Sequence, residues 1–319
     1  MFIAGILLFL LGAAALFWYW RKEGGFARTH LDDTEIQEPE CLAPAIAGIM
    51  AMSAPLPSWH HAQSALYHLA NRGILRVQEL EETVLWRPDQ ADYLLEIVQV
   101  PEQLSEHEQG VLAMLFPEGY TRGASLKASQ LKRAYSKQYR YFADALLHEL
   151  EEKGFLDRRR QYVRGHFGLI CVCSLILALI GCMIGLTVGS TEGIGSVVHL
   201  AFGLLGISAI AFFMRLLYST LSPRGRRQSQ RCREFANSLL TAMKKDTGPE
   251  TFVQYFPYAA GFGWLAAWVY AFQQREALNA PDWYQPRTSG DAPRSFAAML
   301  LMWNSIFTRS NGGDLRKSN

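Results

Sequence analysis

Three long runs of apolar residues divide the chain. They cover residues 2–20, 167–188 and 197–217; the first two contain no charged residue, and the third contains only Arg215, near its end. With a rise of about 1.5 Å per helical residue, each run is about long enough to cross the roughly 30 Å hydrocarbon core of a bilayer. The hydrophobic pattern therefore predicts three transmembrane helices.

The segment between the first two runs has the patterning of a folded soluble domain. Ser105 and Glu108 form a capping box in front of a helix. Gly73 and Gly154 each stand between a helix and a strand, where a glycine ends a helix in a left-handed conformation. This repeated order of helix, glycine and strand is typical of a winged helix, here in tandem. The predicted helices cover 60–71, 111–116, 125–135 and 139–153, and the predicted strands cover 74–78, 83–86 and 155–157.

The segment after the third run predicts further helices. Residues 223–233 are basic, and residues 234–245 form an amphipathic helix. Residues 252–270 are apolar, but Pro257 and two glycines interrupt them, which favours a buried cytosolic helix pair over a fourth span. After a linker that opens at Arg287, one helix has an apolar face that either lies at the membrane interface or docks on the core. That face comprises Phe296, Met299, Leu300, Trp303, Ile306 and Phe307.

The basic residues predict how the chain is oriented in the membrane. They crowd three flanks of the apolar runs, whereas the connector at 189–196 contains none. The protein is predicted to lie in the inner (plasma) membrane. By the positive-inside rule, the N-terminus and this connector lie outside that membrane, and the other parts of the chain between and after the spans lie in the cytoplasm. The first run is predicted to be an uncleaved anchor rather than a signal peptide, because basic residues follow it and none precedes it. The flanking basic residues are Arg21, Lys22, Arg28, Arg158, Arg159, Arg160, Arg164, Arg215, Arg224, Arg226, Arg227, Arg231 and Arg233.

These patterns predict a mainly α membrane protein. It has three transmembrane helices, a cytosolic α+β winged-helix-like domain and a C-terminal cytosolic helical segment. The predicted divisions are a transmembrane helix at 2–20, a linker at 21–40, the winged-helix-like domain at 41–160, transmembrane helices at 167–188 and 197–217, the C-terminal helical segment at 218–286 and a flexible tail with the amphipathic helix at 287–319.

Composition narrows the choice of partners. Half of the residues are hydrophobic and 19% are charged, which suits a few spans plus a soluble part. The net charge of +2 is too small to indicate nucleic acid, and basic residues beside a membrane reflect either orientation or contact with anionic lipid. In the soluble part, basic residues are predicted to spread around a helix and acidic residues follow at 144–152, so we expect no nucleic-acid partner. The basic residues are Lys127, Lys132, Arg133, Lys137 and Arg140.

No motif in the sequence identifies an enzyme, a cofactor site or a metal site. Phosphate-binding glycine loops and the GxSxG nucleophile motif are absent. His60 and His61 are adjacent, and adjacent residues diverge by about 100° around a helix, so this pair cannot readily chelate one metal. The five cysteines form no zinc-type pair, and Asp282 beside Trp283 indicates packing more often than catalysis. We therefore predict a non-enzymatic protein with no catalytic, cofactor-binding or metal-binding residues.

Gly181 and Gly185, in the second run, have the spacing that lets helices approach closely. Two interpretations remain: packing against the third run within one chain, or association of two copies as a homo-oligomer.

Several motifs recur in a fixed order between residues 41 and 284. They read LAPAIAG at 42–48, ALYHLANRGILRV at 65–77, EQGVLAMLF at 108–116, FVQYFPYAAGFG at 252–263 and PDWY at 281–284. In this order they resemble motifs of the domain of unknown function 2207 (DUF2207) family of predicted membrane proteins, which also has a two-span hairpin in the middle. The resemblance implies membrane topology and supplies no catalytic residues. Family members usually carry a large extracytoplasmic β-rich domain before the first span, whereas this chain starts at the span, and Phe256 replaces a leucine; no outward-facing sensing role is therefore carried over.

The sequence thus predicts a scaffold or regulator, tethered to the lipid bilayer, that binds a protein partner through its cytosolic domain. A membrane-bound nucleic-acid regulator and an accessory subunit of a transport or envelope complex are the alternatives. Genomic neighbours would separate these three hypotheses.

Overall fold

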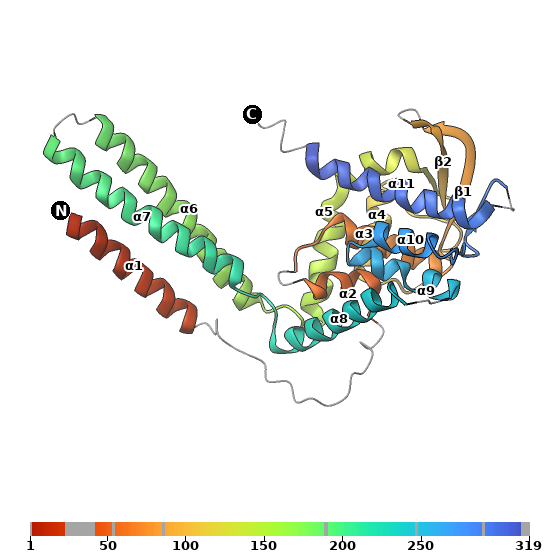
Figure 1. The fold of residues 1–319 in the computed structure, drawn as a ribbon, viewed down its shortest axis with the longest axis horizontal. Coiled ribbons are helices and arrows are strands. Elements are labelled where there is room, and N and C mark those ends of the chain that lie inside the picture. The colour runs from red at the N-terminus through yellow and green to blue at the C-terminus, as the bar shows by residue number, and fades with distance from the viewer. Residues whose placement is uncertain are drawn as a thin grey trace. The chain divides into compact units, whose positions relative to one another are not determined.

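The computed structural model describes residues 2–22, 42–52, 55–84, 87–187, 191–245, 248–288 and 291–313. Over these residues the protein is mainly helical, and the chain divides into two compact units (Figure 1). Unit 1 comprises Met1–Asp33 and Gly154–Arg226, and unit 2 comprises Thr34–Lys153 and Arg227–Asn319.

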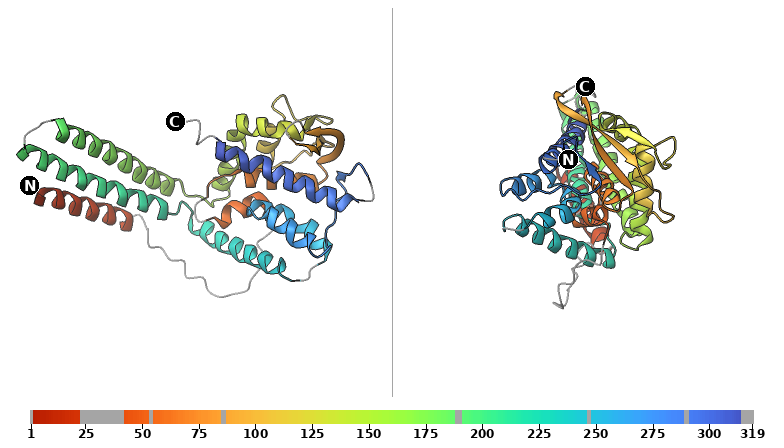
Figure 2. Two further views of the ribbon diagram at one scale, coloured as in Figure 1. Left: turned by 45° about the horizontal axis from the view of Figure 1, so that its top comes forward. Right: turned by 90° about the vertical axis from the view of Figure 1, so that its right-hand side faces the viewer.

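Unit 1 is built from three helices that lie side by side (Figure 2). Each is long and apolar enough to cross a membrane, which confirms the prediction of three apolar helices. The central helix packs against both of the others. The three are α1 (Phe2–Lys22), α6 (Arg158–Thr187) and α7 (Thr191–Leu217), of which α7 is the central one.

Glycines let these helices approach closely. A Cβ on Gly5 would lie 2.5 Å from the backbone oxygen of His199, and one on Gly203 would lie 2.8 Å from the backbone oxygen of Gly5. α1 and α7 therefore meet where neither carries a side chain. Gly181 faces Ala201 on α7, with a hypothetical Cβ 3.4 Å from the alanine methyl. This contact matches the first interpretation of the glycine spacing, packing within one chain.

Apolar side chains cover much of the outside of unit 1. Leu11 is 69% exposed, Met183 is 63% exposed and Phe202 is 65% exposed, whereas Phe167 and Ala211 are fully buried between the helices. A surface of this kind is stable in contact with lipid rather than water.

Unit 2 contains a four-stranded sheet in the order β3-β2-β1-β4. β1 and β2 form an antiparallel hairpin, β3 pairs antiparallel with β2, and β4 pairs parallel with β1 through Val77 and Tyr284. Gly73 precedes β1 with a φ of 73°, and Gly154 has a φ of 69°, so both glycines end a helix in the left-handed conformation as predicted. The strands are β1 (Leu75–Val84), β2 (Arg87–Ile97), β3 (Ser125–Lys127) and β4 (Tyr284–Gln285).

The helices of unit 2 form one core around α3. Gly48 on α2 and Gly261 on α9 touch through backbone, since a Cβ on Gly48 would lie 2.5 Å from the Gly261 oxygen. Phe252 and Phe256 on α9 are fully buried. The helices are α2 (Pro44–Ala51), α3 (Trp59–Asn71), α4 (Glu106–Leu115), α5 (Ala128–Glu152), α9 (Pro249–Gly261), α10 (Leu265–Gln273) and α11 (Ala292–Gly313), with α8 (Pro223–Ala242) beginning in unit 1 and continuing in unit 2.

The structure decides between alternatives for the last helices. α9 and α10 are a pair of short helices with buried faces, and neither is among the three described helices that could span a membrane. α11 docks on the core, because Phe296 and Trp303 are fully buried and the Trp303 ring stacks on Tyr67 at 5.9 Å. The side chains of Ile306 and Phe307 lie outside the described residues.

Several predicted elements of unit 2 and its boundary differ from the observed ones. α5 is a single helix where the sequence predicted two, at 125–135 and 139–153, because the polar residues between them continue a helix without breaking it. Ser125–Lys127 is a strand instead of a helix start. The predicted strands at 74–78 and 83–86 both overlap the single strand β1 (Leu75–Val84), while its partner β2 (Arg87–Ile97) was not predicted. Residues 85–86 lie outside the described residues. The predicted strand at 155–157 is reduced to one bridge between Leu156 and Leu221.

Candidate functional site

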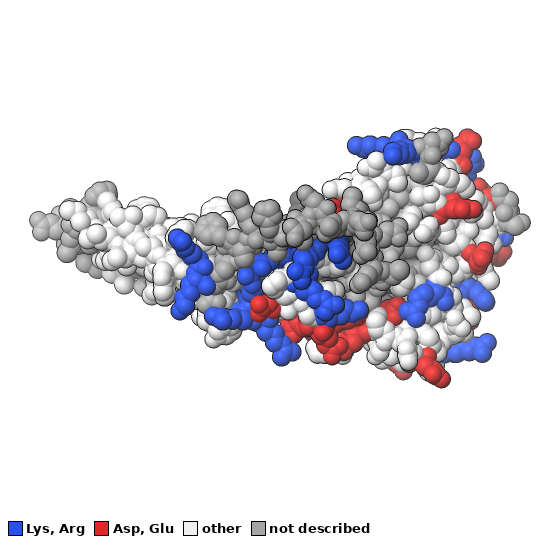
Figure 3. Space-filling model, turned by 90° about the horizontal axis from the view of Figure 1, so that it is seen from below, with Lys and Arg blue, Asp and Glu red and all other residues white. Residues whose placement is uncertain are grey.

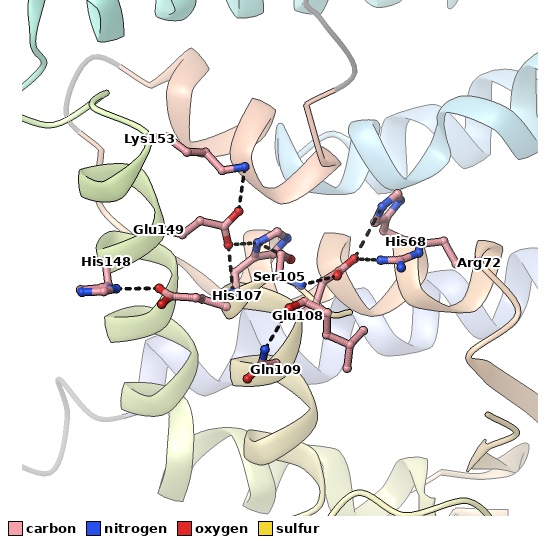
Figure 4. A network of polar contacts seen from close by, with 11 residues as sticks. His68, Arg72, Ser105, His107, Glu108, Gln109, His148, Glu149 and Lys153 are labelled. Atoms are coloured by element: carbon pink, nitrogen blue, oxygen red, sulfur yellow. Dashed lines mark hydrogen bonds and ion pairs between the residues drawn. The ribbon is translucent and has the colours of Figure 1, made fainter. Parts of the chain in front are cut away.

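The first turn of α4 is the centre of a polar network in unit 2. Ser105 caps this helix, and its backbone N–H donates to Glu108 Oε2 at 3.0 Å, which confirms the predicted capping box. The cap fixes where α4 begins and therefore the directions in which the side chains of the three residues after Ser105 point. Each of them, Glu106, His107 and Glu108, contacts an ionisable side chain of another helix (Figure 4).

His107 and Glu149 form a buried pair between α4 and α5. The His107 Nδ1 lies 2.6 Å from Glu149 Oε2, and the His107 backbone N–H donates to the same oxygen at 3.1 Å. Lys153 approaches the other carboxylate oxygen at 3.0 Å. Burial opposes ionisation of Glu149, but the bonds from His107 and Lys153 outweigh it and hold its pKa at about 2. The carboxylate is therefore ionised at neutral pH.

Glu108 links α4 to α3. Its Oε1 accepts from Arg72 Nη1 at 2.5 Å and lies 3.7 Å from His68 Nε2. Burial opposes ionisation of Glu108 too, yet the bonds from Arg72 and Ser105 lower its pKa below the ordinary value. Burial lowers the pKa of His68, so this imidazole is neutral at pH 7.

Glu106 makes the third and most exposed contact, to His148 Nδ1 at 2.7 Å. The hydrogen bond and charge of Glu106 raise the pKa of His148. Ligand-type atoms of Glu106, His148 and Glu152 lie within 4.8 Å of one another, a set that suits a divalent cation by type. A surface ion pair explains the same arrangement, so we assign no metal to it.

This network forms the wall of a hollow of about 490 Å³. The buried carboxylates of Glu108 and Glu149 lie under its surface, with side chains 3% and 5% exposed. Arg72 and Lys153 cover them and are 37% and 43% exposed. The rest of the lining comprises Leu42, Ala43, His68, Gln103, Leu104, Ser105, His107 and Tyr258.

The combination of serine, histidine and glutamate does not form a catalytic triad. In a triad the carboxylate binds one imidazole nitrogen and the serine binds the other. Here Ser105 Oγ, at 3.1 Å, and Glu149 Oε2 both face Nδ1 of His107. The second nitrogen, Nε2, is buried and has no hydrogen-bond partner among the described residues. His107 is therefore placed to hold α4 and α5 together and cannot take a proton from Ser105 in the way a triad requires.

The family described as "Predicted membrane protein (DUF2207) C-terminal domain" matches residues 35–272, about three quarters of the chain. The chain belongs to this family. The match includes α6, α7 and every residue that lines the hollow, so the hollow is part of the DUF2207 domain. No curated protein and no solved structure matches the chain.

The two adjacent histidines noted in the sequence have different partners in the DUF2207 domain. His61 Nδ1 accepts from the backbone N–H of Ser58 at 2.9 Å, while the His60 ring packs on Trp59 at 3.7 Å. Burial lowers the pKa of His60 to about 4 and that of His61 to about 3. Both imidazoles are therefore neutral at pH 7 and serve packing and capping.

The other residues considered from the sequence lie outside the hollow. Trp283 donates to Asn71 Oδ1 at 2.7 Å, so it packs and bonds within the core, while Asp282 is exposed. Arg133, Lys137 and Arg140 are exposed on α5 at positions i, i+4 and i+7, which lie on one side of a helix. This corrects the expectation that the basic residues of α5 spread around its axis; the Lys132 side chain lies outside the described residues.

Sequence reasoning did not identify the contact of His107 with Glu149 as part of a site. The two residues are 42 positions apart, and His107 stands among acidic residues that read as an exposed helix start. Only the approach of α4 to α5 brings them together. One local signal was available: the capping box at Ser105 and Glu108 shows where α4 begins.

Proposed function

We propose that the chain is a non-enzymatic, membrane-tethered recognition protein whose unit 2 lies in the cytosol and binds an acidic segment of a protein partner at the hollow. One observation carries this proposal. The charged groups that reach solvent in the hollow are the cations of Arg72 and Lys153, while their carboxylate partners are buried beneath them. An incoming carboxylate therefore meets exposed positive charge.

The lining of the hollow also supports a protein segment as the ligand. Leu42, Leu104 and Tyr258 give it an apolar part beside the two cations. A peptide with acidic and apolar side chains is complementary to such a surface, because apolar contacts supply affinity and charges supply specificity.

The fold of unit 2 supports a recognition role. α3, Gly73 and the β1–β2 hairpin follow one another as a helix and its wing do, and β3 adds the third strand of the sheet beside β2. We interpret this arrangement as winged-helix-like. Domains of this kind often serve protein contacts, and the hollow rather than the fold decides the assignment.

The cytosolic location rests on charge. The ends of α1, α6 and α7 that carry arginine and lysine are those next to unit 2 in the sequence. The positive-inside rule places such ends on the cytoplasmic side of an inner membrane.

A peptide titration tests the proposed function. The full chain in detergent is titrated with a labelled octapeptide that alternates glutamate and leucine, and with the same peptide carrying glutamine for glutamate. We expect only the acidic peptide to bind, and Lys153→Gln to weaken it about fivefold, since an exposed ion pair contributes up to about 1 kcal/mol. The matched control is Lys137→Gln, which removes the same charge outside the hollow, from α5, the helix that Lys153 follows as its C-cap. Equal affinity for both peptides, or equal losses in both variants, would contradict the proposal.

A second candidate is nucleic-acid binding, which the side of α5 with Arg133, Lys137 and Arg140 favours. The next residue along that side is Asp144, which repels phosphate. Three cations neutralise few phosphates and so release few counterions from a nucleic acid. We therefore expect this surface to bind nucleic acid weakly at most.

A further inference from the structure

A row of four arginines lies at one end of unit 1. Arg160 and Arg164 stand one turn apart on α6, so their side chains leave the same side of the helix. Arg226, in the first turn of α8, and Arg215, at the end of α7, are the other two members. Figure 3 shows lysine and arginine gathered in this part of the molecule, next to the uncharged surface of the apolar helices.

Local structure brings Arg160 and Arg226, the first pair, close to each other. The backbone N–H of Ser222 donates to the Phe155 oxygen at 2.9 Å, and that of Asp157 donates to the Thr220 oxygen at 3.1 Å. These bonds join the start of α6 to the start of α8. Arg160 and Arg226 are then close enough for their charges to interact.

The second pair forms where α6 meets α7. The Arg215 side chain lies across Gly168, where a Cβ would stand 2.9 Å from Nη1. Gly168 is one turn beyond Arg164, and the charges of Arg164 and Arg215 also interact. The absence of a side chain at Gly168 is what lets the Arg215 guanidinium fold back over α6 toward Arg164.

The row has too few carboxylates to neutralise it. Between residues 154 and 226 the chain has seven arginines and only two acidic residues, Asp157 and Glu192, and Glu192 is near the opposite end of α7. Asp157 caps α6, accepting from the backbone N–H of Arg159 at 2.9 Å, and reaches Arg160 at 3.8 Å. Among the described residues, no carboxylate lies within ion-pair distance of Arg164 or Arg215.

One member of the row has an unsatisfied donor. Nε of Arg226 is buried and has no hydrogen-bond partner among the described residues. Clustered like charges and an unpaired buried donor both cost free energy unless an anion is bound. The row lies at the end of helices that are long and apolar enough to cross a bilayer, so the anion nearest to it is a lipid phosphate.

We propose that Arg160, Arg164, Arg215 and Arg226 form a binding site for the headgroup of an anionic phospholipid that carries two phosphates. A guanidinium group can bind two oxygens of one phosphate at once. The two arginine pairs start from Arg160 and Arg164, four residues or about 6 Å apart along α6. Two phosphates on one headgroup would each occupy one pair. This inference is independent of the proposed recognition of an acidic segment by unit 2.

Lipid titration of the full chain, followed by native mass spectrometry, tests the site. The lipids are cardiolipin, with two phosphates and two net negative charges, phosphatidylglycerol, with one of each, and phosphatidylcholine, which has no net charge. We expect one tightly bound cardiolipin and weaker binding of the other two. Since each basic residue near a membrane surface contributes about 1 kcal/mol, the double variant Arg164→Gln/Arg215→Gln should bind cardiolipin roughly thirtyfold more weakly.

The matched control is Arg158→Gln/Arg159→Gln, which removes two exposed charges from the start of the same helix. We expect its cardiolipin affinity to stay within about threefold of the unaltered chain, because general surface charge is screened by salt. The conservative variant Arg164→Lys/Arg215→Lys controls for misfolding, because it keeps both charges. It should bind cardiolipin more tightly than the glutamine variant does. Equal losses in the glutamine variant and the control, equal binding of all three lipids, or full displacement of cardiolipin by inorganic phosphate would overturn the proposal.

Discussion

Replacing Glu149 with glutamine should destabilise unit 2 by an amount that its pKa predicts. The change keeps the shape of the side chain and removes the charge that holds His107 and Lys153. The pKa of Glu149 lies at about 2, compared with an ordinary value of 4.5. A difference of roughly 2.5 units corresponds to about 3 kcal/mol of stability at neutral pH. For a unit of about two hundred residues, this loss lowers the melting temperature by roughly 6–12 °C.

The same pKa fixes the direction of the pH dependence. A carboxylate whose pKa is depressed by folding stabilises the folded state above its unfolded pKa. That contribution is lost as the pH falls through the window from 4.5 to about 2. The unaltered chain should therefore lose stability across this window more steeply than Glu149→Gln, and the two melting temperatures should converge at the acid end.

Thermal unfolding of the full chain in detergent, followed by near-ultraviolet circular dichroism, measures both effects. The control is Glu118→Gln, which neutralises an exposed glutamate in the loop after α4 and should melt within about 1 °C of the unaltered chain. If Glu149→Gln melted as the control does at pH 7, or if the gap between the two stayed constant down to pH 2, the buried ion pair would not have the role described here.

Three further predictions concern backbone, topology and nucleic acid. Gly73→Val should cost about 1 kcal/mol or more in a denaturant titration, since a β-branched residue is strained at a φ of 73°, whereas Gly248→Ala, at a φ of −67°, should cost only about a few tenths of a kcal/mol, from its N-cap position. Reporter fusions at positions 160 and 240 should read cytoplasmic and one within 189–196 should read periplasmic; a periplasmic signal at 160 would reverse the proposed orientation. Mixed-sequence duplex DNA should bind the chain more weakly than about 1 μM at roughly 0.15 M salt, and tighter binding that weakens steeply with salt would favour a nucleic-acid regulator.

The features that the sequence predicted well depend on neighbouring residues. The apolar helices follow from uninterrupted runs of apolar side chains, since a membrane span is defined by composition and length. The left-handed glycines at 73 and 154 and the cap at Ser105 follow from the chemistry of one turn. The resemblance to the DUF2207 family was confirmed for the same reason, because its motifs are short and keep their order.

The features that the sequence did not predict depend on distant residues. β4 pairs with β1 across about two hundred positions in the sequence, and the residue pattern of a short strand does not indicate a partner at that distance. β2 contains Pro88 and Asp89, residues that are depleted in strands, and they fall where its register with β1 shifts, between the pairs Thr83–Ala91 and Val84–Arg87. The His107–Glu149 pair is of the same kind: two polar residues that look solvated in sequence become buried when α4 packs on α5.

Site-specific photocross-linking in cells tests the central claim, that the hollow of unit 2 receives an acidic segment of a partner. A photoreactive amino acid replaces Gln103, which is exposed at the hollow, and in a second chain it replaces Glu118, which is exposed outside it. We expect an adduct from position 103 alone, mapped by mass spectrometry to an acidic stretch of the captured protein and diminished by Lys153→Gln. Adducts of equal yield from both positions, or an adduct at position 103 that maps to a basic or uncharged stretch, would contradict it.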